Sequence, residues 1–150
     1  MWTKDRSVTL SVWCTVAMIV LLGLTALTLP FGLHSGLTIA GVAIYEDHGP
    51  TLLLLYYCFC VPALVALVGT YMIVTNIRRD IVFDVRNVKL LRVVSWAALA
   101  GGVVCLAGTP ISLAFLAVGM VCAFAGVIVR VVKNLITAAV DLKTENDLTI

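Results

Sequence analysis

The side chains best suited to bind a metal ion are two histidines and two acids in one part of the chain. Glu46, Asp47 and His48 are consecutive, and His34 precedes His48 by fourteen residues. Imidazole and carboxylate groups together can bind zinc or another divalent ion. Consecutive residues are nevertheless poorly spaced to surround a metal. We therefore predict no metal site, and we interpret the segment as a hydrated loop with a turn at Gly49–Pro50.

Nucleophilic and redox chemistry also lack the necessary groups. The chain contains no Gly-x-Ser-x-Gly motif, no Ser-His-Asp arrangement and no glycine-rich phosphate loop. Its cysteines lie inside long apolar segments without a Cys-x-x-Cys pair, which is typical of small buried hydrophobic residues. They are Cys14, Cys58, Cys60, Cys105 and Cys122. The sequence therefore predicts neither an enzyme nor a bound cofactor.

The elements that carry these residues are too apolar for a water-soluble fold. Of the 150 residues, 62% are hydrophobic and 12% are charged, whereas soluble domains average roughly 45–50% and about 25%. Four uncharged segments each approach the ~20 residues that a helix needs to cross the hydrocarbon. The sequence predicts one domain, an all-α integral membrane four-helix bundle. Its transmembrane helices are expected at about 8–29, 51–74, 90–108 and 111–130.

Basic residues are distributed according to an alternating topology. The segments 30–50 and 109–110 contain no Lys or Arg. All ten basic residues fall in three other groups: Lys4 and Arg6; Arg78, Arg79, Arg86, Lys89 and Arg92; and Arg130, Lys133 and Lys143. By the positive-inside rule, both termini and the loop 76–89 are cytoplasmic, and the loop 30–50 is extracytoplasmic. Because a net charge of only +2 gives no dense basic surface, we predict no direct nucleic-acid binding.

Both cytoplasmic helix ends are expected to extend beyond the hydrocarbon. Asp84 can cap a helix that begins at Val85, and Arg86, Lys89 and Arg92 then lie along one side, suited to anionic lipid headgroups. After residue 130, polar and apolar residues separate onto two faces within the cytoplasmic tail 131–150. The tail should therefore begin as an amphipathic continuation of the fourth helix, which either lies on the membrane or packs on the central loop.

Small residues recur at four-residue spacing in the last two apolar segments. The pairs are Ala97 and Gly101, Ala98 and Gly102, Gly119 and Ala123, and Cys122 and Gly126. Such pairs let helix backbones approach closely in lipid. We favour packing within one bundle over a dimer interface, and a homo-oligomer stays an open alternative.

The segment from Asp141 to Ile150 has a different charge. It holds three acids and one lysine, so an anionic cytoplasmic leaflet should repel it. A repelled segment that ends in Leu148 and Ile150 is free to contact a protein partner, and the alternative is a frayed terminus.

Two segments resemble a known family. The run Phe83 to Arg92 (FDVRNVKLLR) resembles the Phe-Ser-x-x-Asn-Val-x-x-Leu-Arg stretch of small bacterial membrane proteins catalogued as a domain of unknown function, and Lys143 to Ile150 is similar to their C-terminal tail. Asp84 replaces the usual Ser or Thr and can still cap a helix. The resemblance implies a multi-pass plasma-membrane protein without an assigned activity, often encoded beside a small helix-turn-helix regulator.

These observations favour a non-enzymatic bacterial plasma-membrane protein that holds or responds to a cytoplasmic partner, for which the resemblance suggests a helix-turn-helix regulator. The predicted partner-binding residues are Arg86, Asn87, Lys89, Arg92, Glu145, Asn146, Asp147, Leu148 and Ile150. The alternative is a small carrier or channel, or a self-protection protein against membrane-active peptides. An ion-coupled carrier is disfavoured because the apolar segments hold no charged residue.

Overall fold

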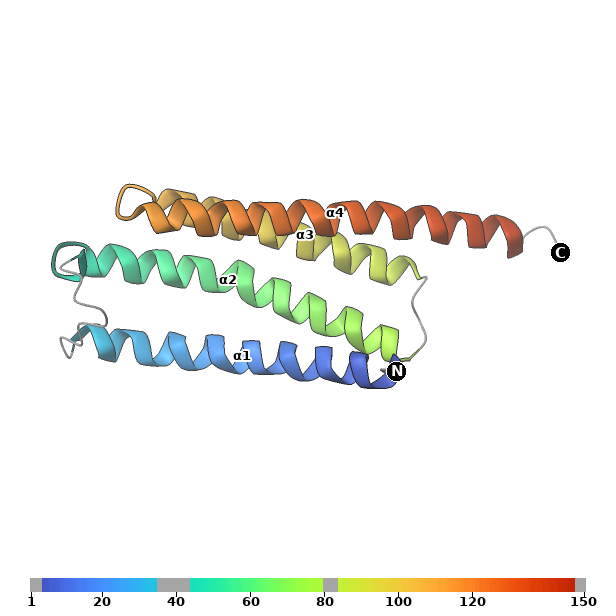
Figure 1. Ribbon diagram of the computed structural model, residues 1–150, viewed down its shortest axis with the longest axis horizontal. Coiled ribbons are helices and arrows are strands. Elements are labelled where there is room, and N and C mark those ends of the chain that lie inside the picture. Colours follow the sequence, from blue (N-terminus) through green and yellow to red (C-terminus); the bar gives the residue numbers. More distant parts are fainter. Residues whose placement is uncertain (1–3, 35–43, 80–83, 148–150) are drawn as a thin grey trace.

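The computed structural model describes residues 4–34, 44–79 and 84–147. Four helices make up nearly all of this part of the chain: α1 (Lys4–His34), α2 (Ile44–Arg78), α3 (Val85–Ala107) and α4 (Leu113–Asp147). Figure 1 shows them running back and forth side by side. Each helix contains a stretch that is long and apolar enough to cross a membrane. The prediction of an all-α bundle of four membrane helices is confirmed.

The helices are longer than the membrane segments expected from the sequence. The interpretation of 30–50 as one loop is wrong, because α1 continues to His34 and α2 begins at Ile44. The predicted turn at Gly49–Pro50 is also wrong, since both residues lie inside α2. The loop expected at 76–89 is shorter, because α2 ends at Arg78 and α3 begins at Val85. Hydropathy reports where a chain leaves the hydrocarbon, whereas backbone hydrogen bonding continues into the headgroup region.

The start of α3 agrees with the sequence. Asp84 has an extended backbone, and its side chain accepts a hydrogen bond of 2.8 Å from the backbone N–H of Arg86. This bond satisfies one of the donors that a helix N-terminus leaves unpaired. The other end of α3 closes at Gly108, and five residues lead into α4. The short connection makes α3 and α4 antiparallel neighbours.

The four helices pack in chain order. Within the described residues, α1 contacts α2, α2 contacts α3 and α3 contacts α4, and no other helix pair is in contact. Figure 1 shows α1 and α4 on opposite sides of the molecule, with α2 between them. Burial follows from it: 39% of the most apolar stretch of α3 is buried, against 6% in α1 and α2 and 11% in α4. The core of the protein is therefore the surface of α3.

Glycine residues bring α3 and α4 close together. A Cβ atom placed on Gly102 would lie 3.1 Å from the backbone oxygen of Gly119 and 3.3 Å from the backbone nitrogen of Ala123. Beside this contact, the buried Ser95 hydroxyl donates a hydrogen bond of 2.9 Å to the carbonyl oxygen of Gly126. Gly101 faces α2 instead, where a Cβ would meet Phe59 at 3.2 Å. The small residues thus serve packing within the bundle, as predicted.

The contact between α1 and α2 is of another kind. The hydroxyl groups of Thr25 and Tyr56 share a hydrogen bond, and the Tyr57 hydroxyl donates one of 2.9 Å to the carbonyl oxygen of Ala26. Gly23, in the same part of α1, has nothing within 4 Å of the position of its missing Cβ. Polar side chains therefore contribute to the contact between α1 and α2, whereas Gly23 takes no part in it.

Candidate functional site at the charged end of the bundle

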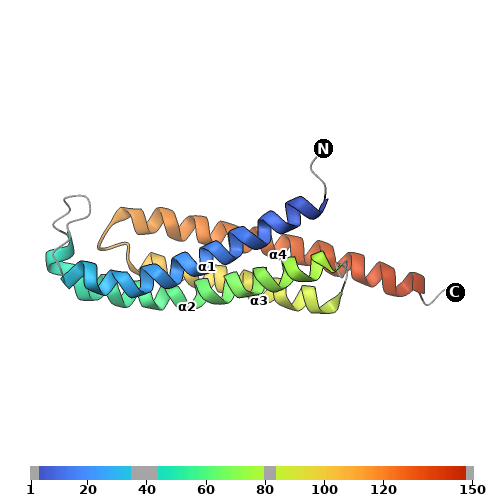
Figure 2. The same cartoon turned by 90° about the horizontal axis from the view of Figure 1, so that it is seen from below.

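Basic residues gather at one end of the molecule. The start of α1, the end of α2, the start of α3 and the end of α4 lie at this end (Figures 1 and 2). All ten Lys and Arg residues belong to the described part of the chain, and they fall on the helix parts nearest this end or on the far half of α4. We call this region, with α4 beyond residue 130, the charged end.

The first turns of α3 present two kinds of side chain. Arg86, Lys89 and Arg92 are exposed on the surface. Asn87 differs, because it is only 2% exposed, and its Oδ1 accepts a hydrogen bond of 2.7 Å from Nδ2 of Asn76 at the end of α2. Asn87 therefore joins α2 to α3. The prediction that Asn87 contacts a partner does not agree with this burial, and we exclude it from the candidate surface.

The sequence grouped Asn87 with Arg86 because the two are adjacent. Successive residues on a helix are separated by about 100° around the axis, so neighbours in the chain face different surroundings. The sequence feature that could have predicted the contact between Asn76 and Asn87 is that each flanks the connection between two apolar helices. Helices joined by a short connection are antiparallel, which places two such amides at the same level.

The second part of the charged end is the α4 extension, which we define as residues 131–147. It continues α4 as one helix beyond the ends of α2 and α3 (Figures 1 and 2), and this confirms that the predicted continuation is helical. Its exposed large apolar side chains are Val131, Val132, Leu135 and Leu142. Its exposed charged side chains are Asp141, Lys143 and Glu145.

The remaining tail residues of the predicted surface are less fully defined. Asn146 and Asp147 form the end of α4, and their side chains are outside the described part of the structure. Leu148 and Ile150 lie outside the described residues altogether. Of the predicted tail surface, the structure therefore places Glu145 on an exposed helical face and extends the backbone to Asp147.

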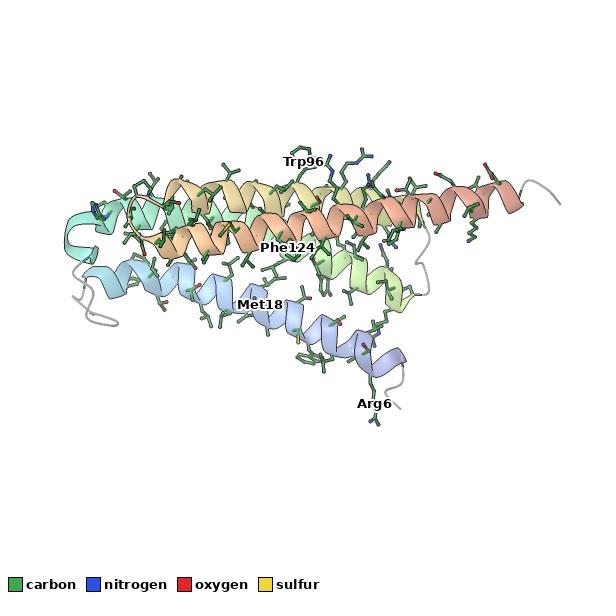
Figure 3. The ribbon with its side chains drawn as sticks, turned by 45° about the horizontal axis from the view of Figure 1, so that its top comes forward. Arg6, Met18, Trp96 and Phe124 are labelled. Carbon is green, nitrogen blue, oxygen red and sulfur yellow. The ribbon has the colours of Figure 1, made fainter. Side chains whose placement is uncertain are left out.

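A cavity of about 310 Å³ joins the two parts of the charged end. Its lining residues are Arg92, Ser95 and Trp96 of α3 with Arg130 and Lys133 of α4. The guanidinium carbon of Arg130 lies 5.1 Å from the centre of the Trp96 ring, within cation–π range. Figure 3 shows Trp96 with nitrogen-bearing side chains beside it.

This cavity could not be predicted from the charge pattern alone, because its cations belong to two separate basic groups of the sequence. Arg92 belongs to the group between the second and third apolar segments, and Arg130 and Lys133 belong to the group after the fourth. Each pair, Arg92 with Trp96 and Arg130 with Lys133, lies where an apolar segment meets a charged one. Because α3 and α4 are antiparallel neighbours, these two boundaries had to meet. That inference needed the short connection after Gly108 as well as the charge pattern.

Comparison with known proteins follows the same helices. The chain matches the family described as Protein of unknown function (DUF2975) over residues 24–150, which covers α2, α3, α4 and the end of α1. The chain belongs to this family. The resemblance to a family of unknown function is thereby confirmed. No curated protein and no solved structure matches the chain. With its four apolar helices, this DUF2975 chain is a multi-pass membrane protein.

The opposite end of this DUF2975 protein has a different character. There, α1 ends at His34 and α2 begins, with His48 in its early turns. The part of the chain that the structure describes contains no group of three or more His, Cys, Asp or Glu residues placed to hold a metal. Toward this end, a mainly apolar cavity of about 280 Å³ lies among all four helices. It is lined by Leu29, Leu52, Leu55, Tyr56, Phe59, Val104, Cys105, Phe115 and Val118.

Proposed function

We propose that this DUF2975 protein is a non-enzymatic, multi-pass protein of a bacterial plasma membrane, and that its charged end binds a cytoplasmic protein partner. One observation carries the proposal. The α4 extension projects past α2 and α3 (Figure 1) and leaves large apolar side chains uncovered, with Leu142 67% exposed. Apolar surface that projects beyond a membrane domain is typical of an interaction site.

The charge distribution supports a cytoplasmic position for this surface. Lys and Arg residues near membrane spans accumulate on the cytoplasmic side, and the charged end carries all ten of them. Both termini and the connection between α2 and α3 then lie in the cytoplasm. A cytoplasmic regulator, such as the helix-turn-helix protein implied by the family resemblance, can reach the α4 extension in this topology.

The side chains of the α4 extension indicate what kind of partner surface fits it. Val131, Leu135 and Leu142 lie at i, i+4 and i+11, so they form one apolar stripe along the helix. Asp141 and Glu145 are exposed charged residues on the same part of α4. An amphipathic helix of this type binds in an apolar groove, and acidic neighbours favour a groove with a basic rim.

Site-specific photo-crosslinking in living cells tests the proposal. A photoreactive residue replaces Leu142 in one variant and Leu113 in the other. Both are exposed leucines of α4, at 67% and 74%, and they lie at opposite ends of the helix. We expect a cytoplasmic protein to be attached only to the Leu142 variant. In a pull-down, truncation after Ala139 should remove the same protein.

Two results would contradict the proposal. The first is the same set of attached proteins at both positions, or identical partners for the full-length and truncated chains. The second is an adduct of the chain with itself at Leu142, because that result would identify a homo-oligomer interface rather than a partner surface.

A carrier or channel for an apolar solute, or a peptide self-protection protein, is the second candidate. It is favoured by the apolar cavity among the four helices. Tryptophan in place of Phe59 would partly fill this cavity. If the protein moves an apolar solute, flux into proteoliposomes should fall in Phe59→Trp and stay unchanged in the truncation after Ala139. Partner binding predicts the reverse pattern. No flux is then measured for any variant, and the partner is lost in the truncation but kept in Phe59→Trp.

A further inference from the structure

The cavity between α3 and α4 at the charged end concentrates positive charge. Arg92 comes from α3, whereas Arg130 and Lys133 come from α4, and no acidic side chain of the described residues lines the cavity. Like charges that converge repel one another unless an anion lies between them. The volume, about 310 Å³, lies in the range of small-molecule binding sites.

The walls of the cavity are held in place by contacts that do not use the cationic donors. Arg130 lies against the Trp96 ring with 5.1 Å between the guanidinium carbon and the ring centre, and this contact orients the guanidinium without occupying its N–H groups. Ser95 donates its hydroxyl hydrogen to Gly126 of α4, so it fixes the distance between the helices. The guanidinium N–H groups of Arg130 thus keep their hydrogen-bonding capacity for a ligand.

The cationic side chains of the cavity lie within reach of lipid phosphates at the charged end. Arg92 precedes Ala107 by fifteen residues and Arg130 follows Leu113 by seventeen, which corresponds to rises of about 22 and 26 Å from the connection between the helices. The hydrocarbon layer is about 30 Å thick, so these two positions lie about 8 and 4 Å inside its edge. Long arginine side chains span such distances by extending toward the headgroups. Trp96, 57% exposed, lies about one turn deeper.

We propose that this cavity binds the phosphate of an anionic phospholipid headgroup. Arg130 offers paired N–H donors to the phosphate oxygens, and Arg92 and Lys133 add positive charge from either side. The exposed face of Trp96 lies against the upper part of the acyl chains. Basic pockets between membrane helices on the cytoplasmic side are suited to anionic headgroups. This inference does not depend on the protein partner proposed above.

Lipid titration of the purified full-length protein in detergent tests the inference, with bound lipid counted by native mass spectrometry. The probes are phosphatidylglycerol, phosphatidylcholine and inorganic phosphate. We expect one phosphatidylglycerol to bind at least tenfold more tightly than phosphatidylcholine. The double variant Arg130→Gln/Lys133→Gln should lose this preference. Arg86→Gln is the matched control, because it removes a cation from α3 outside the cavity, and it should keep the preference.

A second variant tests the inference even if the double variant misfolds. Arg130→Lys keeps the charge but removes the planar pair of donors, and we expect a loss of about threefold in affinity with an unchanged melting temperature. Three outcomes would overturn the inference. The first is equal affinity for the two lipids. The second is an equal loss of affinity for phosphatidylglycerol in Arg86→Gln and in the double variant. The third is displacement of the bound lipid by inorganic phosphate at a concentration equal to that of the lipid.

Discussion

The α3–α4 pair and the α1–α2 pair use different ways of holding helices together. Between α3 and α4, glycines bring backbone atoms so close that one added carbon on Gly102 would lie 3.1 Å from a backbone oxygen. Between α1 and α2, the hydroxyl groups of Tyr56 and Tyr57 form hydrogen bonds with Thr25 and Ala26, and Gly23 of α1 faces open space. The apolar stretch of α3 is 39% buried and that of α1 only 6%.

This difference shows what determines the core of a small membrane protein. Lipid is as apolar as leucine, so apolar side chains gain little by leaving it, and helices associate through close packing and hydrogen bonds. The α3–α4 pair has both, with Ser95 beside the glycine contact. The first helix has hydrogen bonds to α2 but no such glycine contact at Gly23, and its apolar stretch is only 6% buried. Substitutions of the same type in the two regions should therefore have unequal effects.

Leucine at a glycine position gives the largest expected difference. In Gly102→Leu, the new side chain meets backbone atoms of Gly119 and Ala123 that cannot rotate away, so we expect a loss of about 3 kcal/mol in the free energy of unfolding. The matched control Gly23→Leu points into open space and should change stability by less than about 0.5 kcal/mol. Thermal unfolding in detergent measures both, and equal shifts would remove the distinction between the two pairs.

Loss of the buried asparagine contact should have the next largest effect. Asn87→Ala removes the acceptor of the Asn76 amide in a buried place, which costs about 2 kcal/mol. Because the two side chains share one hydrogen bond, the double variant with Asn76→Ala should be little less stable than Asn87→Ala alone. Chemical unfolding of the four proteins in mixed micelles gives the coupling energy, and simple additivity would contradict the contact.

The serine hydrogen bond between α3 and α4 is expected to contribute less. Ser95→Ala should lower stability by about 0.6 kcal/mol, the average for hydrogen bonds between membrane helices. Ser11→Ala of α1 is the control, because the Ser11 hydroxyl bonds only to the carbonyl oxygen of Ser7 in its own helix. Thermal unfolding should be unaffected by the control. An equal loss in both variants would show that the contact with Gly126 adds nothing.

The smallest effect concerns the attachment of α1. Tyr57→Phe removes the hydrogen bond to the carbonyl oxygen of Ala26 and should cost a few tenths of a kcal/mol. Distances between spin labels should reveal it: the distribution between α1 and α2 broadens, while that between α3 and α4 stays the same. A broadening of the α3–α4 distribution would mean that the two pairs are not independent.

The features that could be predicted from the sequence are local. Composition and segment length predicted four membrane helices, the side chain of Asp84 predicted the start of α3, and the separation of polar and apolar residues predicted that α4 continues as a helix. Each of these depends on residues within a few turns of one another. The small-residue spacing likewise predicted close packing within the bundle, although not that Gly102 faces α4 while Gly101 faces α2.

The features that could not be predicted depend on contacts between distant residues. The bond between Asn76 and Asn87 and the position of Arg130 over Trp96 need the rotation of each helix about its axis, which a single sequence does not specify. The same limit placed Asn87 wrongly on the candidate surface. The loop boundaries were predicted wrongly for another reason: helical hydrogen bonding extends beyond the apolar segments into the headgroup region.

We propose that the charged end, with the α4 extension, lies in the cytoplasm. Single cysteines at Pro110, in the α3–α4 connection, and at Thr144, on the α4 extension, test it directly, with the chain lacking an added cysteine as control. Both positions are exposed. A membrane-impermeant maleimide should label Pro110→Cys in intact cells and Thr144→Cys only after permeabilisation. Labelling of Thr144→Cys in intact cells would contradict the account.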